Sequence, residues 1–472
     1  ATITSDGDYA VTFAFDAPNT LFLHELTFRD GGDRTIAAFI PGHFLQQFHP
    51  DYVDAAELDA MVSAAGYSTW TQLFEQKAMI TDTPERPSMA AWVPKDSTVS
   101  DPVFVLTRNP YYIGVDTAGN QLPYVDEVHF RFFSDAETLN FSAVAGEFDF
   151  QARHINMTNY PVLVQNAERS GYRVLTWPTF GGSDAAIWFN QVYAHDPELG
   201  ELLANRDFRI ALSHAINRDE IRESAFLGLG EVRQNVPSPW HPYYPGDEAA
   251  LRYTEFDPEL ANEILDGLGL EMGSDGRRTL PSGAPFTIEI SIVPAFGPWP
   301  DVGQLVAADW NSVGVSTVTQ IRERNAHFSM RDSNDLMVEI WNEDTTGFPF
   351  TGNPKMDVRS TPAAAFATEY RIWYETDGEQ GLPPTAPIAR MVEIIDSART
   401  VGPEEQIELA HELFEIITTE VYSLGTVGLT PLVQGVVVVN ENLRNVPEIA
   451  GNDWPLRTPG NSRPEQFYFS NN

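Results

Sequence analysis

The sequence of 472 residues contains no cysteine. This absence excludes disulfide bonds, zinc sites with thiolate ligands and catalysis by a thiol, and it is compatible with any redox compartment. Lysine is also scarce, with only Lys77, Lys95 and Lys355, and 67 Asp and Glu against 29 Lys and Arg give a formal net charge of −38. Because a field of this sign repels nucleic acids and anionic membranes, we expect no nucleic-acid partner and favour a neutral or cationic ligand. The acidic excess is also typical of a salty habitat, where ions screen self-repulsion within about 10 Å or less.

Long apolar runs are missing as well. No stretch approaches the roughly 18 residues that a membrane-spanning helix requires, and the opening residues, ATITSDGDYAVTFAF, do not have the pattern of a signal peptide. Tyr9, Val11, Phe13 and Phe15 alternate with smaller side chains. This period of two predicts that the sequence opens inside a strand.

Motifs for catalysis and for metal binding are absent too. The sequence has no H-E-x-x-H motif, EF-hand loop, G-x-S-x-G elbow, Walker loop or dinucleotide fingerprint, and its ten histidines are scattered, with His43 and His49 the closest pair. We therefore predict no catalytic residue, no metal site and no cofactor, and expect that the protein is not an enzyme. A hydrolase would need two carboxylates that face each other across a cleft at about 5 to 10 Å.

The residues that are present indicate an ordered protein of at least two lobes, because single cores stop growing near about 250 to 300 residues. FTIEISIV (286–293), VSTVTQIR (315–322) and DLMVEIW (335–341) have the pattern of strands, and DVGQLVAADWNSVG (301–314) that of an amphipathic helix. Strand, helix and strand at this spacing predict a parallel α/β sheet. A further helix is predicted at 402–420 and a further strand at 433–439.

Aromatic side chains are the remaining feature with chemical potential. Several of the ten tryptophans stand beside polar residues, in WFN (188–190), WNED (341–344) and WYETDGE (373–379). Indole faces stack on sugar rings or on peptide side chains, and adjacent amides and carboxylates give directional hydrogen bonds. The alternative interpretation is that each tryptophan packs in a core or between lobes.

Two long motifs resemble those of one family. The stretch NPYYIGVDTAGNQLPYVDEVHF (109–130) is similar to N-P-x-Y-x-x-x-D-x-x-G-N-Q-L-P-Y-[IV]-D, and NRDFRIALSHAINRDEIRESAFLGLG (205–230) to V-R-x-A-L-x-x-A-I-[DN]-R-x-x-I, with Phe208 in place of Val. Both motifs are those of the family 5 extracellular solute-binding proteins, the receptors of ABC importers for oligopeptides, dipeptides and nickel. The resemblance continues in order through 256–270 and 373–384 to TPGNSRPEQFYF (458–469).

This resemblance implies an α/β fold of the periplasmic-binding-protein type II, with two lobes, a hinge of two chain crossings and a ligand cleft between the lobes. The first lobe is expected at 1–180, the second at 181–428, and the return to the first lobe at 429–472. The crossings should lie within 177–190 and 423–435. Relatives carry a signal sequence and the first strands of the first lobe ahead of a segment like the opening one, so the resemblance implies an N-terminally truncated chain. The 109–130 segment is expected to act as scaffold.

The implied function is that of a periplasmic or extracytoplasmic membrane-associated receptor, which we expect to be a monomer. It would enclose its solute and deliver it to the permease subunits of an ABC importer. Trp341 and Asp344 keep the W-x-x-D element of the peptide-binding relatives, but the Y-x-D-P continuation is replaced by TTGFPF. The blocks at 373–384 and 458–469 are similar to those of a subgroup associated with oligosaccharide uptake.

We therefore favour an oligosaccharide, with an oligopeptide as the alternative and other small solutes after these; the scarcity of histidine argues against nickel. A chaperone-like or signalling receptor of the same fold is a further alternative, which only the partner proteins would distinguish. The predicted ligand contacts at the first crossing are Trp188 and Asn190. Those on the second lobe are Trp341, Asn342, Asp344 and Trp373, with Trp299 as an additional candidate.

Overall fold

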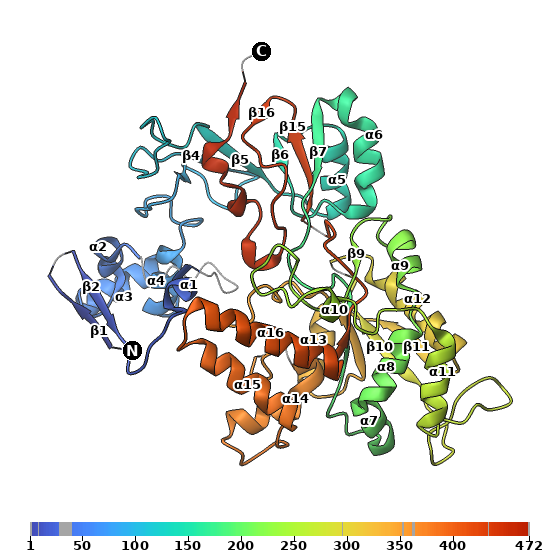
Figure 1. The fold of residues 1–472 in the computed structure, drawn as a ribbon. Helices are drawn as coiled ribbons and strands as arrows, with labels where there is room; N and C mark the ends of the chain where they lie inside the picture. Colours follow the sequence, from blue (N-terminus) through green and yellow to red (C-terminus); the bar gives the residue numbers. More distant parts are fainter. Residues whose placement is uncertain are drawn as a thin grey trace.

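The computed structural model describes residues 2–7, 9–27, 40–294, 296–351, 354–360, 364–432 and 434–470. Within these residues the chain forms two α/β bodies, each around its own sheet, and a set of smaller elements on the N-terminal side (Figure 1). No helix in these ranges is long and apolar enough to cross a membrane.

The larger sheet has five strands in the order β11-β10-β12-β8-β13. They are β8 (Ala186–Phe189), β10 (Ile288–Ile292), β11 (Thr317–Ile321), β12 (Val338–Trp341) and β13 (Ser423–Leu424). β10 is parallel to β11 and β12, whereas β8 is antiparallel to β12 and β13. The helix α12 (Trp299–Ser312) connects β10 to β11. The predicted strands and the predicted helix of this region are confirmed, with the helix beginning two residues earlier than expected.

Both faces of this sheet are covered. Along β8, Ile187 and Phe189 belong to one core with α12, and Ala186 and Trp188 belong to another with α14 (Ala364–Glu375), α15 (Ala386–Ala398) and α16 (Pro403–Glu420). Because successive side chains of a strand point to opposite faces, α12 and the α14–α16 layer lie on opposite sides of the sheet. The predicted helix at 402–420 is thus confirmed as α16.

The smaller sheet is antiparallel and has the order β6-β15-β7. Its strands are β6 (Phe150–Gln151), β7 (Tyr172–Thr176) and β15 (Val436–Asn440). The four valines of β15 are fully buried, and α5 (Ala136–Val144) and α6 (Tyr160–Ser170) pack beside this sheet (Figure 1). The predicted strand at 433–439 is β15; Val433 lies outside the described residues.

Two chain segments join the sheets. Residues 177–185 run from β7 to β8, and the chain returns from β13 through β14 (Val427–Gly428) and 429–435 to β15. The two segments lie side by side, because the backbone N–H of Trp177 donates to Gly435 O (2.7 Å) and that of Asp184 to Val427 O (2.8 Å). The architecture is therefore two α/β lobes with a hinge of two crossings. The boundaries at 180 and 428 stay predictions.

The 109–130 segment forms a hydrogen-bonded loop that leads into a strand. The Asp116 carboxylate accepts from the Asn120 backbone N–H (2.8 Å) and from the Tyr124 hydroxyl (2.7 Å), and the Tyr124 N–H donates to Glu465 O (3.3 Å). The loop thus holds the small antiparallel sheet against the C-terminal segment. The strands of this sheet are β3 (Trp92–Pro94), β4 (Val103–Arg108) and β5 (Glu127–Arg131).

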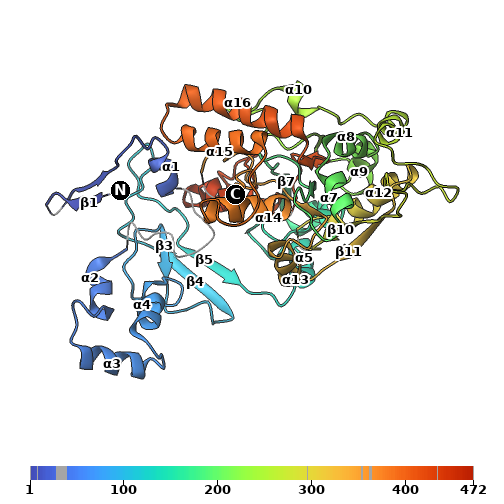
Figure 2. The ribbon, with the colours of Figure 1, turned by 90° about the horizontal axis from the view of Figure 1, so that it is seen from below.

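The described N-terminal residues form a hairpin and then a short helix, α1 (Phe22–Thr27). The second strand of the hairpin, Val11–Ala14, confirms the strand that the alternation predicted. This helix lies next to α15 and α16 in both views (Figures 1 and 2). The Thr20 N–H donates to Arg399 O (2.9 Å), and Leu21 is buried in the core of the α14–α16 layer.

The other elements of the N-terminal side are β1 (Thr2–Ser5), β2 (Val11–Ala14), α2 (Gly42–Leu45), α3 (Ala55–Ala64) and α4 (Trp70–Ala78). The part of the chain that contains the five-stranded sheet also has α7 (Pro197–Ala204), α8 (Arg206–His214), α9 (Arg218–Ser224), β9 (Glu231–Val232), α10 (Asp247–Ala250), α11 (Pro258–Gly267) and α13 (Arg324–Asp332). The C-terminal segment adds the hairpin of β16 (Leu443–Arg444) and β17 (Tyr468–Phe469).

Arg218 on α9 offers a test of how the second crossing is held. Its buried guanidinium donates to Gly425 O (2.8 Å), Ser213 O (2.8 Å) and Ser213 Oγ (2.7 Å). Arg218→Met would leave these buried acceptors unpaired, so we expect a loss of about 3 kcal/mol in the free energy of unfolding, measured with urea. Arg222→Met, on the same helix but with exposed ion-pair partners, should cost less than about 1 kcal/mol. Equal losses in both variants would contradict the assignment.

Candidate functional site

The turn after β12 packs directly on the first crossing. The Gly182 N–H donates to Glu343 O (3.0 Å), and the Glu343 N–H donates to Ser183 O (2.9 Å). A Cβ atom at Gly181 would lie 2.3 Å from Glu343 O and 2.9 Å from Asp453 Oδ1, so a larger residue does not fit there. The glycine pair of the crossing is therefore explained by close backbone approach.

A buried ion pair lies behind this turn. The Lys355 Nζ atom is 3.1 Å from Glu343 Oε1 and donates to Asn342 O at 3.0 Å, and the Trp188 Nε1–H donates to Glu343 Oε1 at 2.8 Å. The ammonium is also 5.9 Å from the ring centroid of Trp188 and 5.6 Å from that of Trp341. We call these five residues the Lys355 cluster. Burial raises the pKa of Glu343 to about 7, against the lowering effect of the Lys355 charge.

Three further carboxyl groups converge at the crossings. Asp453 accepts hydrogen bonds from the backbone N–H groups of Phe180 (2.6 Å) and Gly181 (2.9 Å), and Asp184 accepts from the Thr430 N–H (2.9 Å). Burial raises the pKa of Asp184 to about 7 and that of Asp453 to about 8, where the neighbouring charges of Asp344 and Asp184 add to the effect. The pKa of Asp344 is raised by burial as well and lowered by the Lys355 charge.

Aromatic side chains reach the surface beside these carboxyl groups. Trp240 is 64% exposed, and its ring lies edge to face on Phe180 with 5.6 Å between the centroids. Trp454 is 38% exposed and has the guanidinium carbons of Arg153 and Arg457 at 4.3 and 4.2 Å from its ring centroid. We call Phe180, Trp240 and Trp454 the rim aromatics. Trp240 has the larger exposed area of the two tryptophans and is held at the first crossing by the Ser238 N–H, which donates to Phe180 O (3.0 Å).

Five of the seven predicted ligand residues lie in one region. Trp188, Trp341 and Asn342 belong to the Lys355 cluster, and Asp344 follows it in the chain. Trp299 packs on Trp341 with 5.1 Å between ring centroids, and its Nε1–H donates to Asp184 O at 2.8 Å. Trp188 and Trp299 are buried, so neither presents a free ring face in this conformation.

The other two predicted residues lie away from this region. Asn190 is buried at the end of β8, where its amide donates to Asn334 Oδ1 (2.9 Å) and Leu336 O (2.7 Å). Trp373 lies on α14, with its ring edge to face on Tyr374 at 5.0 Å. Ligand contact by the seven residues stays a prediction.

Sequence reasoning missed Lys355, the rim aromatics and Asp453. Lys355 carried one signal, since the chain has only three lysines. Trp240 lies in VPSPWHPYYP (236–245), a segment whose solvent exposure no local pattern reports. Asp453 had no signal, because it is one of 67 acidic residues.

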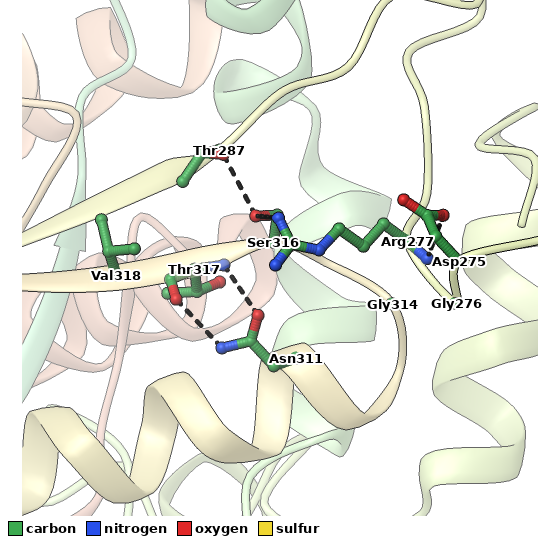
Figure 3. A pocket seen from close by; sticks show the side chains of 9 residues that line it. All are labelled: Asp275, Gly276, Arg277, Thr287, Asn311, Gly314, Ser316, Thr317 and Val318. Atoms are coloured by element: carbon green, nitrogen blue, oxygen red, sulfur yellow. Dashed lines mark hydrogen bonds between the residues drawn. The ribbon is translucent and has the colours of Figure 1, made fainter. Parts of the chain in front are cut away.

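A separate depression of about 470 Å³ lies at the edge of the larger sheet, beside β11 (Figure 3). Polar side chains that line it already have hydrogen-bond partners within the protein: Asn311 bonds to the backbone of Thr317, and Arg277 donates to Ser316 Oγ at 3.4 Å. None of the predicted ligand residues lines it. In the described ranges, no group of three or more His, Cys, Asp or Glu side chains is arranged to hold a metal ion.

The buried carboxyl groups predict a pH dependence of stability. With folded-state pKa values near 7 and 8 against an ordinary value of 3.8, the folded chain keeps protons on Asp184 and Asp453 that the unfolded chain releases. Their contribution to stability therefore falls as pH rises from about 4 to about 8, by at most about 1.4 kcal/mol per pH unit and group. Urea unfolding at pH 5.5 and 8.5 should show a smaller fall in Asp453→Asn than in the wild type. Equal falls would contradict a raised pKa at Asp453.

The sequence profile of the bacterial extracellular solute-binding proteins, family 5 Middle, matches residues 1–358. The periplasmic alpha-galactoside-binding protein of Rhizobium meliloti (strain 1021) is 25% identical over 437 residues, which cover 86% of this chain and 56% of that protein. The chain thus spans little more than half of the length of this curated relative.

Solved structures show the same architecture. An oligopeptide-binding protein OppA is 31% identical, with a TM-score of 0.78 over 100% of this chain and 75% of that one. The binding protein MelB of Agrobacterium fabrum C58, solved with stachyose, has a TM-score of 0.62 at 21% identity and covers 91% of this chain and 62% of that one. The predicted two-lobe type II fold is confirmed by these similarities.

Proposed function

Because the chain belongs to the bacterial extracellular solute-binding proteins, family 5, we propose that it captures an oligosaccharide between its lobes and delivers it to the permease of an ABC importer. The binding protein acts outside the cytoplasm, as a monomer, and makes or breaks no covalent bond. Closure of the lobes is the functional step. A ligand drives closure only through its tighter contacts with the closed form, and a shift from 1:99 to 99:1 takes about 5.5 kcal/mol of differential affinity.

The exposed indole of Trp240 is the observation that carries the choice of ligand. It stands at the first crossing against Phe180, while Trp188, Trp299 and Trp341 are buried. A flat apolar face next to polar backbone and carboxyl groups matches the alternation of C–H faces and hydroxyl groups on a sugar ring. Such an arrangement gives affinity without requiring a charge on the ligand.

Electrostatics supports a neutral solute. The chain carries a formal net charge of −38. This field would repel an anionic ligand. A neutral sugar has no charge that must lose its hydration when it binds. The similarity to an alpha-galactoside-binding protein points in the same direction.

An oligopeptide is the second candidate. The OppA structure is similar over the whole chain, and the Asp344 carboxyl beside the first crossing offers an acceptor for a ligand ammonium. The names of neighbours do not separate the two candidates: a Thermotoga maritima protein called oligopeptide-binding has been solved with mannohexaose.

Thermal unfolding in the presence of defined solutes tests the proposal. Stachyose, mannohexaose and a nonapeptide are added separately, since a ligand at 100 times its Kd stabilises the folded form by about 2.7 kcal/mol. We expect a concentration-dependent rise in Tm with at least one oligosaccharide. A rise in Tm with the nonapeptide alone would favour an oligopeptide over an oligosaccharide. No rise in Tm with any of the three solutes would contradict both candidates.

Trp240→Ala tests the rim directly. Removing the exposed indole should raise the Kd for the stabilising oligosaccharide about tenfold, roughly 1.4 kcal/mol, and leave Tm without ligand unchanged. Titration calorimetry measures the Kd. Tyr111→Ala is the matched control, because Tyr111 is 86% exposed in the 109–130 loop and distant in sequence from the crossings. Wild-type affinity in Trp240→Ala would remove Trp240 from the ligand site.

A further inference from the structure

Lys355 is an unusual residue in this chain. It is one of three lysines in 472 residues, and the structure buries it, with a side chain only 7% exposed. Lysine is rarely buried unless it is paired, because its ammonium loses hydration. Its partner, Glu343, is completely buried as well. A buried pair of this kind is weak evidence for stability, since apolar residues of similar size often do as well.

The surroundings of the Lys355 ammonium have the chemistry of a cation-recognition site. A carboxylate oxygen (Glu343 Oε1) lies at 3.1 Å and a backbone carbonyl (Asn342 O) at 3.0 Å. Two indole rings, of Trp188 and Trp341, have their centroids at 5.9 and 5.6 Å. Aromatic faces combined with a carboxylate are the means by which proteins recognise alkylammonium ligands. Here the ammonium group of Lys355 itself occupies this position, which we call the ammonium seat.

The seat adjoins the place where the ligand is proposed to enter. Asn342 and Glu343 belong to the turn that packs on Gly181 and Gly182 of the first crossing, and Asp344 is the next residue. The Lys355 charge lowers the pKa values of both Glu343 and Asp344, against the effect of burial. The ammonium thus already offsets the negative charge that a cationic ligand would otherwise meet.

We propose that Lys355 is a built-in counter-ion, which occupies the ammonium seat of Trp188, Trp341 and Glu343 and makes the site select uncharged solutes over solutes that present an ammonium group. The inference rests on the proposed function for the position of the ligand site. It explains how a strongly acidic receptor discriminates against amines, including peptides with a free amino terminus. A second ammonium at the seat would meet the charge of the first, and like charges at close range are unfavourable.

Alkylammonium rescue tests the seat without any sugar. Lys355→Ala removes a propylammonium fragment from the cluster and leaves its space and the Glu343 carboxylate. Propylammonium chloride should raise the Tm of Lys355→Ala with concentration, relative to sodium chloride at equal ionic strength, and should leave the wild type and Lys355→Arg unchanged. The double variant Lys355→Ala/Glu343→Gln should not respond, because the carboxylate is gone. Equal responses in the wild type and in Lys355→Ala would overturn the proposal.

A second arm measures ligand selection. The affinities of a nonapeptide with a free and with an acetylated amino terminus are compared by calorimetry. We expect the wild type to bind the acetylated peptide more tightly than the free amine, and the affinity ratio to shift at least tenfold toward the free amine in Lys355→Gln, which keeps side-chain donors for Asn342 O and Glu343. An unchanged ratio in Lys355→Gln, or no detectable binding of either peptide to it, would overturn the proposal.

Folding is controlled separately. If Lys355→Ala folds in propylammonium chloride but not in sodium chloride, the seat is supported; if it folds in neither salt while the double variant folds, the free space does not accept an ammonium and the proposal fails. The rescue involves no oligosaccharide, so its failure is distinguishable from failure of the proposed function. A chain that binds no sugar can still show the seat, and a chain that binds stachyose can still lack it.

Discussion

The arrangement of the whole molecule depends on buried hydrogen bonds between two chain crossings that lie side by side. Backbone groups in a crossing have no sheet or helix of their own to pair with, and an unpaired buried N–H is costly. Here the crossings bond to each other, at Trp177 and Gly435 and at Asp184 and Val427. The carboxyl groups of Asp453 and Asp184 accept further backbone N–H groups and tie the C-terminal segment to the same place. These bonds fix the position at which the two sheets meet.

The same pair of crossings gathers buried carboxyl groups in a chain that already carries an excess of acidic residues. Carboxyl groups suit the task because each offers two acceptors to the backbone, but their burial raises their pKa values toward neutrality. One of the three lysines of the chain, Lys355, lies behind the turn that follows β12 and pairs with Glu343. The proposed selection of uncharged ligands rests on these same contacts.

Burial separates two kinds of tryptophan at this site. Trp188, Trp299 and Trp341 donate hydrogen bonds or pack on each other and on Lys355, so that they shape the wall of the site from inside the lobe. Trp240 presents its ring to solvent at the crossing. The proposed ligand contact therefore rests on Trp240, whereas the buried tryptophans take part in the packing of the lobe.

The sequence by itself determined whether most of the predicted segments form helices or strands. The strands β10, β11 and β12, the helices α12 and α16 and the loop before β5 follow from hydrophobic period and turn residues, which are local properties. The ordered motifs also determined the family, and both crossings lie within the segments that the resemblance indicated.

Only the tertiary structure decided which aromatic and charged residues make the candidate site. The local sequence around Trp188 (WFN) or Trp240 (PWHP) does not report that the first indole is buried and the second exposed, because exposure depends on what packs against the ring from distant segments. The pairing of Lys355 with Glu343 likewise exists only because the chain folds back after β12 and brings the two charges together out of water.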